Sequence, residues 1–151
     1  MGILIISDNR KAFHDYFVLE TYEAGIMLTG SEVKSCRNKQ VQLKDSYVTF
    51  RGKEAFLQNS HIAEYKQSGI NNHAPERYRK LLLHSNQLEK ISSSLREKGL
   101  SCVPLKIYFK EGLVKVELGL VKGKKTHDKR DAIKKRDISQ QLRQTMRRDR
   151  R

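Results

Sequence analysis

The final thirty residues most constrain the fold of this chain, because they cannot contribute to a hydrophobic core. Segment 122–151 holds thirteen Lys or Arg residues and four Asp residues, which gives it a net charge of +9. Its only large apolar side chains are Ile133, Ile138, Leu142 and Met146. Such a segment buries too little apolar surface to offset the entropy that ordering would cost. We therefore expect a basic C-terminal tail that is disordered alone.

The same tail has features of a helix that forms on binding. Ile138, Leu142 and Met146 recur every four residues, so they would share one face of a helix. Asp128 and Asp131 lie near its start and four arginines lie among its last five residues, which suits the helix dipole. The alternative is a basic tail that only adds solubility or loose affinity.

The rest of the chain is also basic. The 151 residues carry a net charge of +14, so about +5 remains when the tail is removed. Such a balance indicates nucleic acid or an anionic membrane surface as partner. No apolar run approaches the roughly 18 residues that a membrane span requires. We expect nucleic acid and no membrane as partner. Cys36 and Cys102 form no CxxC motif, and we expect a reduced, cytoplasmic protein.

Two hairpins are the strongest predicted elements. The first pairs strands at 47–50 and 54–57, and the second pairs strands at 103–109 and 113–121. The last strand alternates apolar with charged residues, which is typical of a half-buried strand. Gly119 interrupts this strand and predicts a kink or the close approach of another part of the chain.

Other segments are predicted less sharply. Residues 8–16 are expected to form a polar arm and 16–23 a strand, whereas the apolar run 80–84 fits either strand or helix. Residues 66–79 are predicted as a polar, basic loop.

Two helices complete the predicted body. Thr29 and Glu32 form a capping-box pattern, which predicts a helix over 31–38. A second helix should begin at Asn86, as its cap, and end at Gly99.

These elements predict a mainly β fold with short helices. Because no βαβ spacing occurs, we expect a closed antiparallel barrel of about six strands, similar to the OB-fold, with two or three packed helices. The predicted organisation is an N-terminal extension at 1–8, an RNA-binding barrel at 9–123 and the tail at 124–151.

The sequence contains no recognisable catalytic or metal-binding pattern. Its five histidines and two cysteines lack zinc-site spacing, and no nucleotide-binding or hydrolase motif occurs. We therefore expect a protein that is not an enzyme and that requires no metal or other cofactor.

Clusters of basic residues are more informative. They comprise Lys34 and Arg37; Arg77, Arg79 and Lys80; and Lys122, Lys124 and Lys125 around Gly123. Contacts from such side chains to phosphates give affinity without sequence specificity. Tyr16, Tyr22 and Tyr78 are candidates for stacking on bases, although ordinary half-buried packing in a sheet is the favoured explanation for each of them.

Five stretches carry a resemblance to a known family. They are NRKA from Asn9 with Tyr16, GIMLTGSEVKSCR from Gly25, DSYV from Asp45 followed by EAFL from Glu54, RKLLLH from Arg79, and VPLKIYFKEGLVKVELGLVKGKKTHDKR from Val103. In order and spacing, they resemble the SsrA-binding protein (small protein B) family over residues 9–138.

The resemblance implies a function in bacterial trans-translation. Members have an OB-like barrel and bind the tRNA-like domain of transfer-messenger RNA (tmRNA), and we expect this chain to be a monomer. They deliver it with elongation factor Tu to stalled ribosomes, where the nascent chain is tagged for proteolysis. The family's tail enters the empty mRNA channel near the decoding centre and folds there as a helix.

The resemblance also implies site residues. On the body, Asn9, Glu32, Lys122 and Lys124 match family positions that contact RNA, and the basic neighbours Arg10, Lys34, Arg37 and Lys125 complete the predicted surface. In the tail, the predicted contacts with the decoding centre and mRNA channel are Gly123, His127, Asp128, Lys129, Arg130, Lys134, Lys135, Arg136 and Ile138.

Ile138 and Glu32 differ from the other predicted site residues. Ile138 stands where members often have Trp, so we expect only an apolar contact there. Glu32 has two interpretations, because it could cap the helix at 31–38 or contact a donor group on RNA; the resemblance favours the RNA contact.

Overall fold

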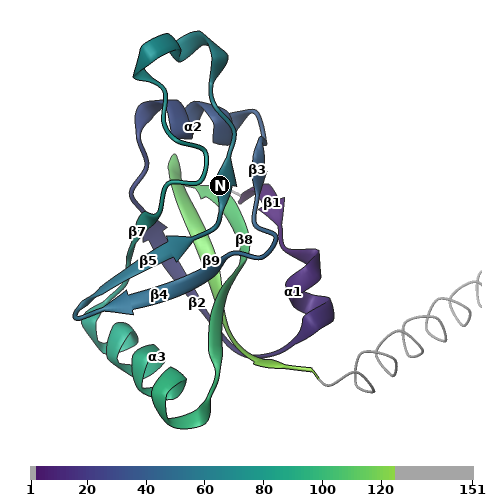
Figure 1. Cartoon of the computed structure of the whole chain (residues 1–151), viewed down its shortest axis with the longest axis vertical. Coiled ribbons are helices and arrows are strands. Elements are labelled where there is room, and N and C mark those ends of the chain that lie inside the picture. Colours follow the sequence, from purple (N-terminus) through teal and green to yellow (C-terminus); the bar gives the residue numbers. More distant parts are fainter. Residues whose placement is uncertain (1–2, 125–151) are drawn as a thin grey trace, which may run out of the picture.

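The computed structural model describes residues 3–124, which fold as a mainly β unit with short helices (Figure 1). Nothing further is described for residues 1–2 and 125–151. In chain order the elements are β1 (Leu4–Asp8), α1 (Arg10–Asp15), β2 (Tyr16–Ile26), α2 (Gly30–Arg37), β3 (Val41–Gln42), β4 (Tyr47–Arg51), β5 (Glu54–Gln58), β6 (His61–Ile62), the 3-10 helix η1 (Lys66–Asn71), β7 (Arg79–Leu82), α3 (Ser85–Lys98), β8 (Ser101–Lys110) and β9 (Leu113–Gly123).

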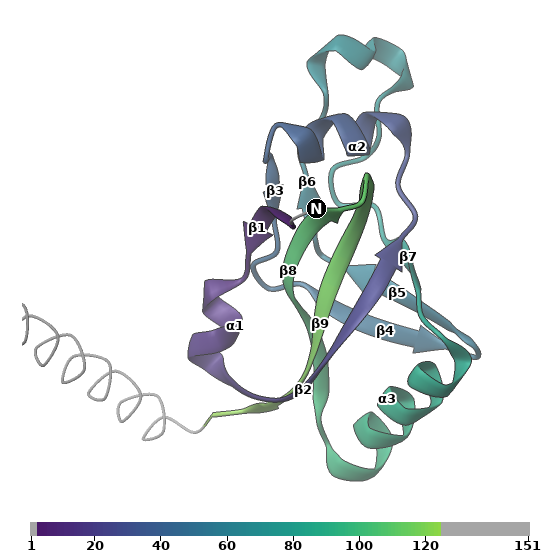
Figure 2. The ribbon, with the colours of Figure 1, turned by 180° about the vertical axis from the view of Figure 1, so that it is seen from behind.

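The main sheet is antiparallel and folds over on itself. Its seven strands follow the order β1-β8-β9-β2-β7-β5-β4, while β3 and β6 pair separately. Strands β4 and β5 cross in front of β8 and β9 in Figure 1 and behind them in Figure 2, and β4 contacts β8. Apolar residues from both halves of the folded sheet meet in the core, including Val48, Leu57, Ile107, Val116 and Leu118.

The predicted closed barrel is wrong, although the mainly β, antiparallel architecture is confirmed. Among the described strands, the two ends of the main sheet, β1 and β4, do not pair. The reason lies in residues 4–8, within the predicted N-terminal extension. They form β1 and pair with β8 from Lys106 to Phe109, while β9 pairs with the other edge of β8. Both edges of β8 are therefore occupied along this stretch, and β4 can only pack across it.

The predicted hairpins are confirmed as β4–β5 and β8–β9. Strand β2 continues beyond the predicted 16–23, and the ambiguous run at 80–84 contributes to strand β7. The close approach predicted at Gly119 is also present, because a Cβ there would lie 2.8 Å from Cδ1 of Leu105.

Helices α2 and α3 agree with the predicted helices apart from the start of α3, whereas α1 was not predicted. The capping box of Thr29 and Glu32 opens α2 as predicted, and Gly99 ends α3 in the left-handed conformation. The α3 capping box uses His84 instead of Asn86. The predicted polar arm at 8–16 is largely α1, because the side chain of Asn9 caps that helix.

The three α-helices lie at different places around the sheet. Helices α2 and α3 lie at opposite ends of the molecule, and α1 lies beside the end of β9 (Figure 1). Buried Ala12 docks α1 against Val103, Leu105 and Val121 of the sheet. The last described residue, Lys124, therefore emerges next to α1, where its amide donates a hydrogen bond to the Asp15 carbonyl at 2.9 Å.

Candidate nucleic-acid interface

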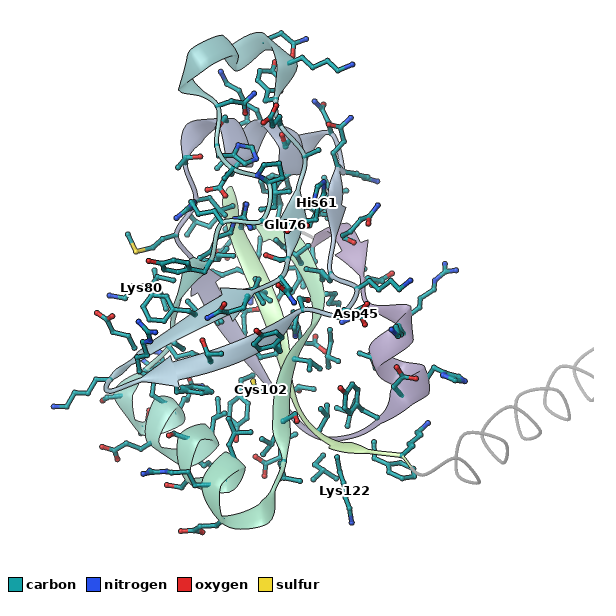
Figure 3. All side chains as sticks on the ribbon, viewed as in Figure 1. Asp45, His61, Glu76, Lys80, Cys102 and Lys122 are labelled. Atoms are coloured by element: carbon teal, nitrogen blue, oxygen red, sulfur yellow. The ribbon has the colours of Figure 1, made fainter. Side chains whose placement is uncertain are left out.

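Exposed cationic side chains occur at separate places on the described surface. Lys80 and Lys122 both point outward, far apart on the molecule (Figure 3). We call the region that contains Lys34, Arg37, Arg77, Tyr78 and Lys80 the α2–β7 face. We call the set formed by Phe13, Phe17, Lys122 and Lys124 the α1–β9 patch.

The α2–β7 face is organised around a buried ion pair. Glu32 and Arg79 are both 0% exposed, and Arg79 Nε donates a hydrogen bond to the Glu32 carboxylate. The other Glu32 oxygen accepts from Arg77 at 2.6 Å and from the Thr29 amide at 2.8 Å. The remaining Arg79 donors reach Ser60 and the carbonyls of Pro75 and Arg77. A buried charge pair requires this degree of hydrogen bonding to offset its desolvation.

The ionisation of Glu32 follows from these contacts. Burial raises the pKa of the carboxyl, but the hydrogen bonds from Arg77 and Thr29 and the charge of Arg79 outweigh it. The pKa of Glu32 is therefore held below its ordinary value, and the group is a carboxylate at neutral pH.

This network changes the interpretation of two predicted residues. The Glu32 carboxylate does not reach the surface, so the arrangement does not support its predicted direct contact with RNA. The prediction that Arg79 belongs to a basic cluster on the surface is wrong, because its side chain is fully buried. What the network presents to solvent is Arg77, with a side chain 38% exposed, and Tyr78, which is 62% exposed and packs edge-on against Phe56.

Helix α2 adds further cations to this face. Lys34 and Arg37 are exposed, and the Lys34 ammonium lies 5.3 Å from the centre of the Tyr65 ring. Two buried serines hold the helix in place: Ser35 donates to the Ala63 carbonyl at 2.6 Å, and Ser31 lies 2.8 Å from Nδ1 of His73. The opposite side of α2 is thereby left to solvent.

Asn9 has a structural role at the other end of the sheet. It is buried, its Oδ1 accepts from the Ala12 amide, and its Nδ2 donates to the Pro104 carbonyl at 2.8 Å. Both ends of the side-chain amide are thus used within the protein. The neighbouring Arg10 is exposed and free of this constraint, so it is the better placed of the two to meet RNA.

The α1–β9 patch places two predicted lysines on one corner. Lys122 is exposed and lies opposite Phe17 in the β2–β9 ladder. The Lys124 ammonium lies 5.1 Å from the centre of the Phe17 ring and 3.3 Å from the Phe13 carbonyl. Gly123 pairs with Tyr16. The other predicted tail and body contacts lie outside the described residues: Lys125, His127, Asp128, Lys129, Arg130, Lys134, Lys135, Arg136 and Ile138.

The aromatic side chains that are exposed in the structure are mostly not the tyrosines that were predicted to stack on bases. Tyr16 and Tyr22 are half-buried against the core, as ordinary packing predicts, and of the three tyrosines only Tyr78 is prominently exposed. Phe13 and Phe17, which the sequence analysis did not single out, are 46% and 45% exposed. The alternation of Phe17 with Tyr16 and Val18 along β2 could have indicated this outward face.

The described residues include no candidate metal centre and no reactive thiol. No group of three or more His, Cys, Asp or Glu residues within 3–124 could hold a metal ion. Burial raises the pKa of the Cys36 and Cys102 thiols to about 12, so neither is a nucleophile at neutral pH. Within the same residues, none of the helices has the length and apolar character needed to cross a membrane.

Comparison with known proteins relates the whole chain to one family. Residues 6–148 match the family model described as SmpB protein. An SsrA-binding protein of Bdellovibrio bacteriovorus is 67% identical over 149 residues, covering 99% of this chain and 98% of the relative. One from Geobacter metallireducens is 52% identical over 147 residues, covering 97% of this chain and 96% of the relative.

A solved structure shares the fold. It is described as "tmRNA-SmpB: a journey to the center of the bacterial ribosome" and aligns with a TM-score of 0.69 and 47% identity, covering 84% of this chain and 93% of that one.

Proposed function

The chain belongs to the SmpB family of SsrA-binding proteins, and from this premise we propose that it binds tmRNA and delivers it to stalled ribosomes for trans-translation. The RNA segment that we propose is the tRNA-like domain. After delivery, the ribosome resumes on the RNA's own reading frame and adds a tag that directs the incomplete product to proteolysis. The observation that carries this proposal is the family match over residues 6–148, which includes both the folded body and the basic tail.

The body is proposed to hold the RNA by its exposed cations. Arg10, Lys34, Arg37, Lys122 and Lys124 all lie at least partly exposed, where phosphates can reach them. The curled antiparallel sheet supports an OB-like assignment in which one sheet face carries RNA, although its ends do not close. Glu32 contributes indirectly, because its carboxylate fixes the Arg77 side chain that borders exposed Tyr78.

The tail is proposed to report that the mRNA channel is empty. Lys124 is held against α1, so the segment that we propose to be disordered alone is 125–151; it would fold as a helix in the channel, with Gly123 and His127 near the decoding centre. The Asp128–Arg130 stretch and the basic residues beyond it would follow the channel wall. The composition supports this proposal, because neutralisation by RNA removes the charge repulsion that opposes helix formation.

We propose elongation factor Tu as a member of the delivery complex, with the protein acting as a monomer in the cytoplasm. It acts by binding and placement, and the bond-making steps belong to the ribosome.

Selective RNA binding tests the proposal. We expect a gel shift at ~0.2 M salt to show a clear preference of the full chain for the tRNA-like domain of tmRNA over bulk tRNA, because nonspecific electrostatic binding weakens steeply at that salt. A basic translation protein of another kind would bind ribosomal RNA equally well without tmRNA. Equal affinity for the tRNA-like domain and for bulk tRNA under these conditions would reject the proposed function.

A further inference from the structure

We propose that the α1–β9 patch holds an unpaired base of RNA, with the base stacked on Phe17 and its phosphates held by Lys122 and Lys124. This inference rests on the proposed function for the class of partner, and it adds a site and a mode of contact. The same chemistry could be supplied by tmRNA or by ribosomal RNA, and the experiment below distinguishes these two sources.

The first observation is the exposure of two phenylalanines on one corner. Phe13 and Phe17 are 46% and 45% exposed, although neighbouring Ala12 and Val121 are buried in the cluster that docks α1. Phe17 lies in a strand whose adjacent residues, Tyr16 and Val18, pack against that cluster, so the ladder directs Phe17 to the outer face. Leu19, two residues further along β2, is also exposed. The corner is therefore apolar where ordinary solvation would favour polar residues.

The second observation is the set of cations around this ring. Lys122 lies directly opposite Phe17 in the ladder, which puts both side chains on the same face. The Lys124 ammonium lies 5.1 Å from the Phe17 ring centre, within the range of a cation–π contact. An aromatic face bordered by lysines is the combination that single-stranded nucleic-acid sites use, because each base offers a π-face and each nucleotide a phosphate.

The third observation is that the corner is held in place before any ligand binds. The Lys124 amide donates to the Asp15 carbonyl at 2.9 Å, and its ammonium lies 3.3 Å from the Phe13 carbonyl. Asn9 fixes the start of α1 to β8 through the Pro104 carbonyl. Because α1 and the end of β9 are joined at both backbone and side-chain level, the patch loses little conformational entropy on binding.

Charge argues against the other possible occupants. Segment 125–151 of the same chain has a net charge of +7, so it would be repelled by Lys122 and Lys124. The single carboxylate of Asp15, which lies 3.0 Å from His14 Nδ1, is outnumbered by the two ammonium groups of Lys122 and Lys124. A polyanion with flat apolar groups meets both properties of the surface, and RNA with an unpaired base is such a partner.

The test compares variants of the full chain that differ only in exposed apolar residues. Phe17→Ala removes the ring, Phe17→Tyr keeps it, and Leu113→Ala removes a 60% exposed side chain at the far β8–β9 turn. Each is measured for affinity to the tRNA-like domain of tmRNA and to the small ribosomal subunit. We expect Phe17→Ala to weaken the affinity for either the tRNA-like domain or the small ribosomal subunit by roughly 5- to 150-fold, which is the effect of losing one base–aromatic stack. Phe17→Tyr and Leu113→Ala should bind within about twofold of the unmodified chain.

A cross-linking measurement identifies the occupant. With a photoreactive benzoylphenylalanine in place of Phe17, we expect a cross-link to an unpaired nucleotide. That nucleotide should belong to the RNA whose affinity is weakened by Phe17→Ala. A cross-link only to protein, or equal affinities for Phe17→Ala and the unmodified chain on both RNAs, would overturn the inference. A different result would reject the proposed function, namely that the unmodified chain shows no preference for the tRNA-like domain. Thermal unfolding of Phe17→Ala confirms that any lost affinity does not arise from lost folding.

Discussion

Glu32→Gln is expected to lower the free energy of unfolding by about 3–5 kcal/mol, because it leaves a buried guanidinium without its counter-charge. Arg79 is fully buried and its Nε donates to Glu32, so no water can replace the lost carboxylate. A glutamine can still accept the hydrogen bond from the Thr29 amide, which keeps the helix cap. The decrease in the free energy of unfolding therefore reflects the loss of the ion pair. Urea unfolding followed by circular dichroism measures this decrease.

Glu54→Gln is the matched control, since it removes the same charge from an exposed pair. Glu54 lies 3.2 Å from Lys80, and both side chains are largely open to solvent. We expect a change of only about 0–1 kcal/mol. Equal losses for the two variants would show that the Glu32–Arg79 pair does not hold the α2–β7 face together.

The same pair makes the stability of the fold depend on pH. Because the pKa of Glu32 is lower in the folded than in the unfolded state, its contribution is complete above the ordinary carboxyl pKa of 4.5. It is lost as the pH falls through the lower folded-state value. Glu32→Gln should therefore lose less stability than the unmodified chain when the pH is lowered below 4.5.

Ending the chain at Lys125 is expected to separate RNA binding from ribosome rescue. The body retains Lys122, Lys124 and the α2–β7 face, so affinity for the tRNA-like domain should stay within about tenfold at ~0.2 M salt, where long-range attraction by the tail is screened. Tagging of stalled products should fall to background, because the segment proposed to enter the mRNA channel is missing. Gel shifts and a reconstituted translation assay measure the two effects.

A chain with residues 126–151 in scrambled order is the control for charge, since it keeps the composition and loses the sequence. We expect it to bind RNA like the unmodified chain and to fail in tagging. Tagging by the scrambled chain would show that only the charge of the tail is needed. Loss of RNA binding on truncation would reject this division of labour between body and tail.

The parts of the fold that the sequence predicted are those with local causes. The two hairpins depend on short turns and alternating residues, and α2 depends on a cap three residues from its partner, so each could be inferred within a short window. Strand β1 could not be inferred, because its partner β8 lies about a hundred residues away and its edge position depends on the whole sheet. The wrong prediction of a closed barrel has the same origin.

The same contrast between local and long-range causes applies to the site. The exposure of Lys34, Lys122 and Arg37 could be expected from their position on α2 and at the end of β9. The burial of Arg79 could not, because it is imposed by Glu32, 47 residues earlier in the chain. Asn9 was identified as a functional residue from a family pattern, whereas the structure shows a cap and anchor for α1. The charge of Arg79 and the family motif at Asn9 drew attention to both positions, but only the contacts show what each side chain does.

Tagging of a stalled nascent chain is the most direct test of the account. A reconstituted translation reaction on a message without a stop codon would receive tmRNA with or without the full-length protein. We predict that the tag appears only when both are present, and that a message with an intact stop codon yields none. Equal tagging in the absence of the protein, or no tagging in its presence although the RNA binds, would contradict the proposed role.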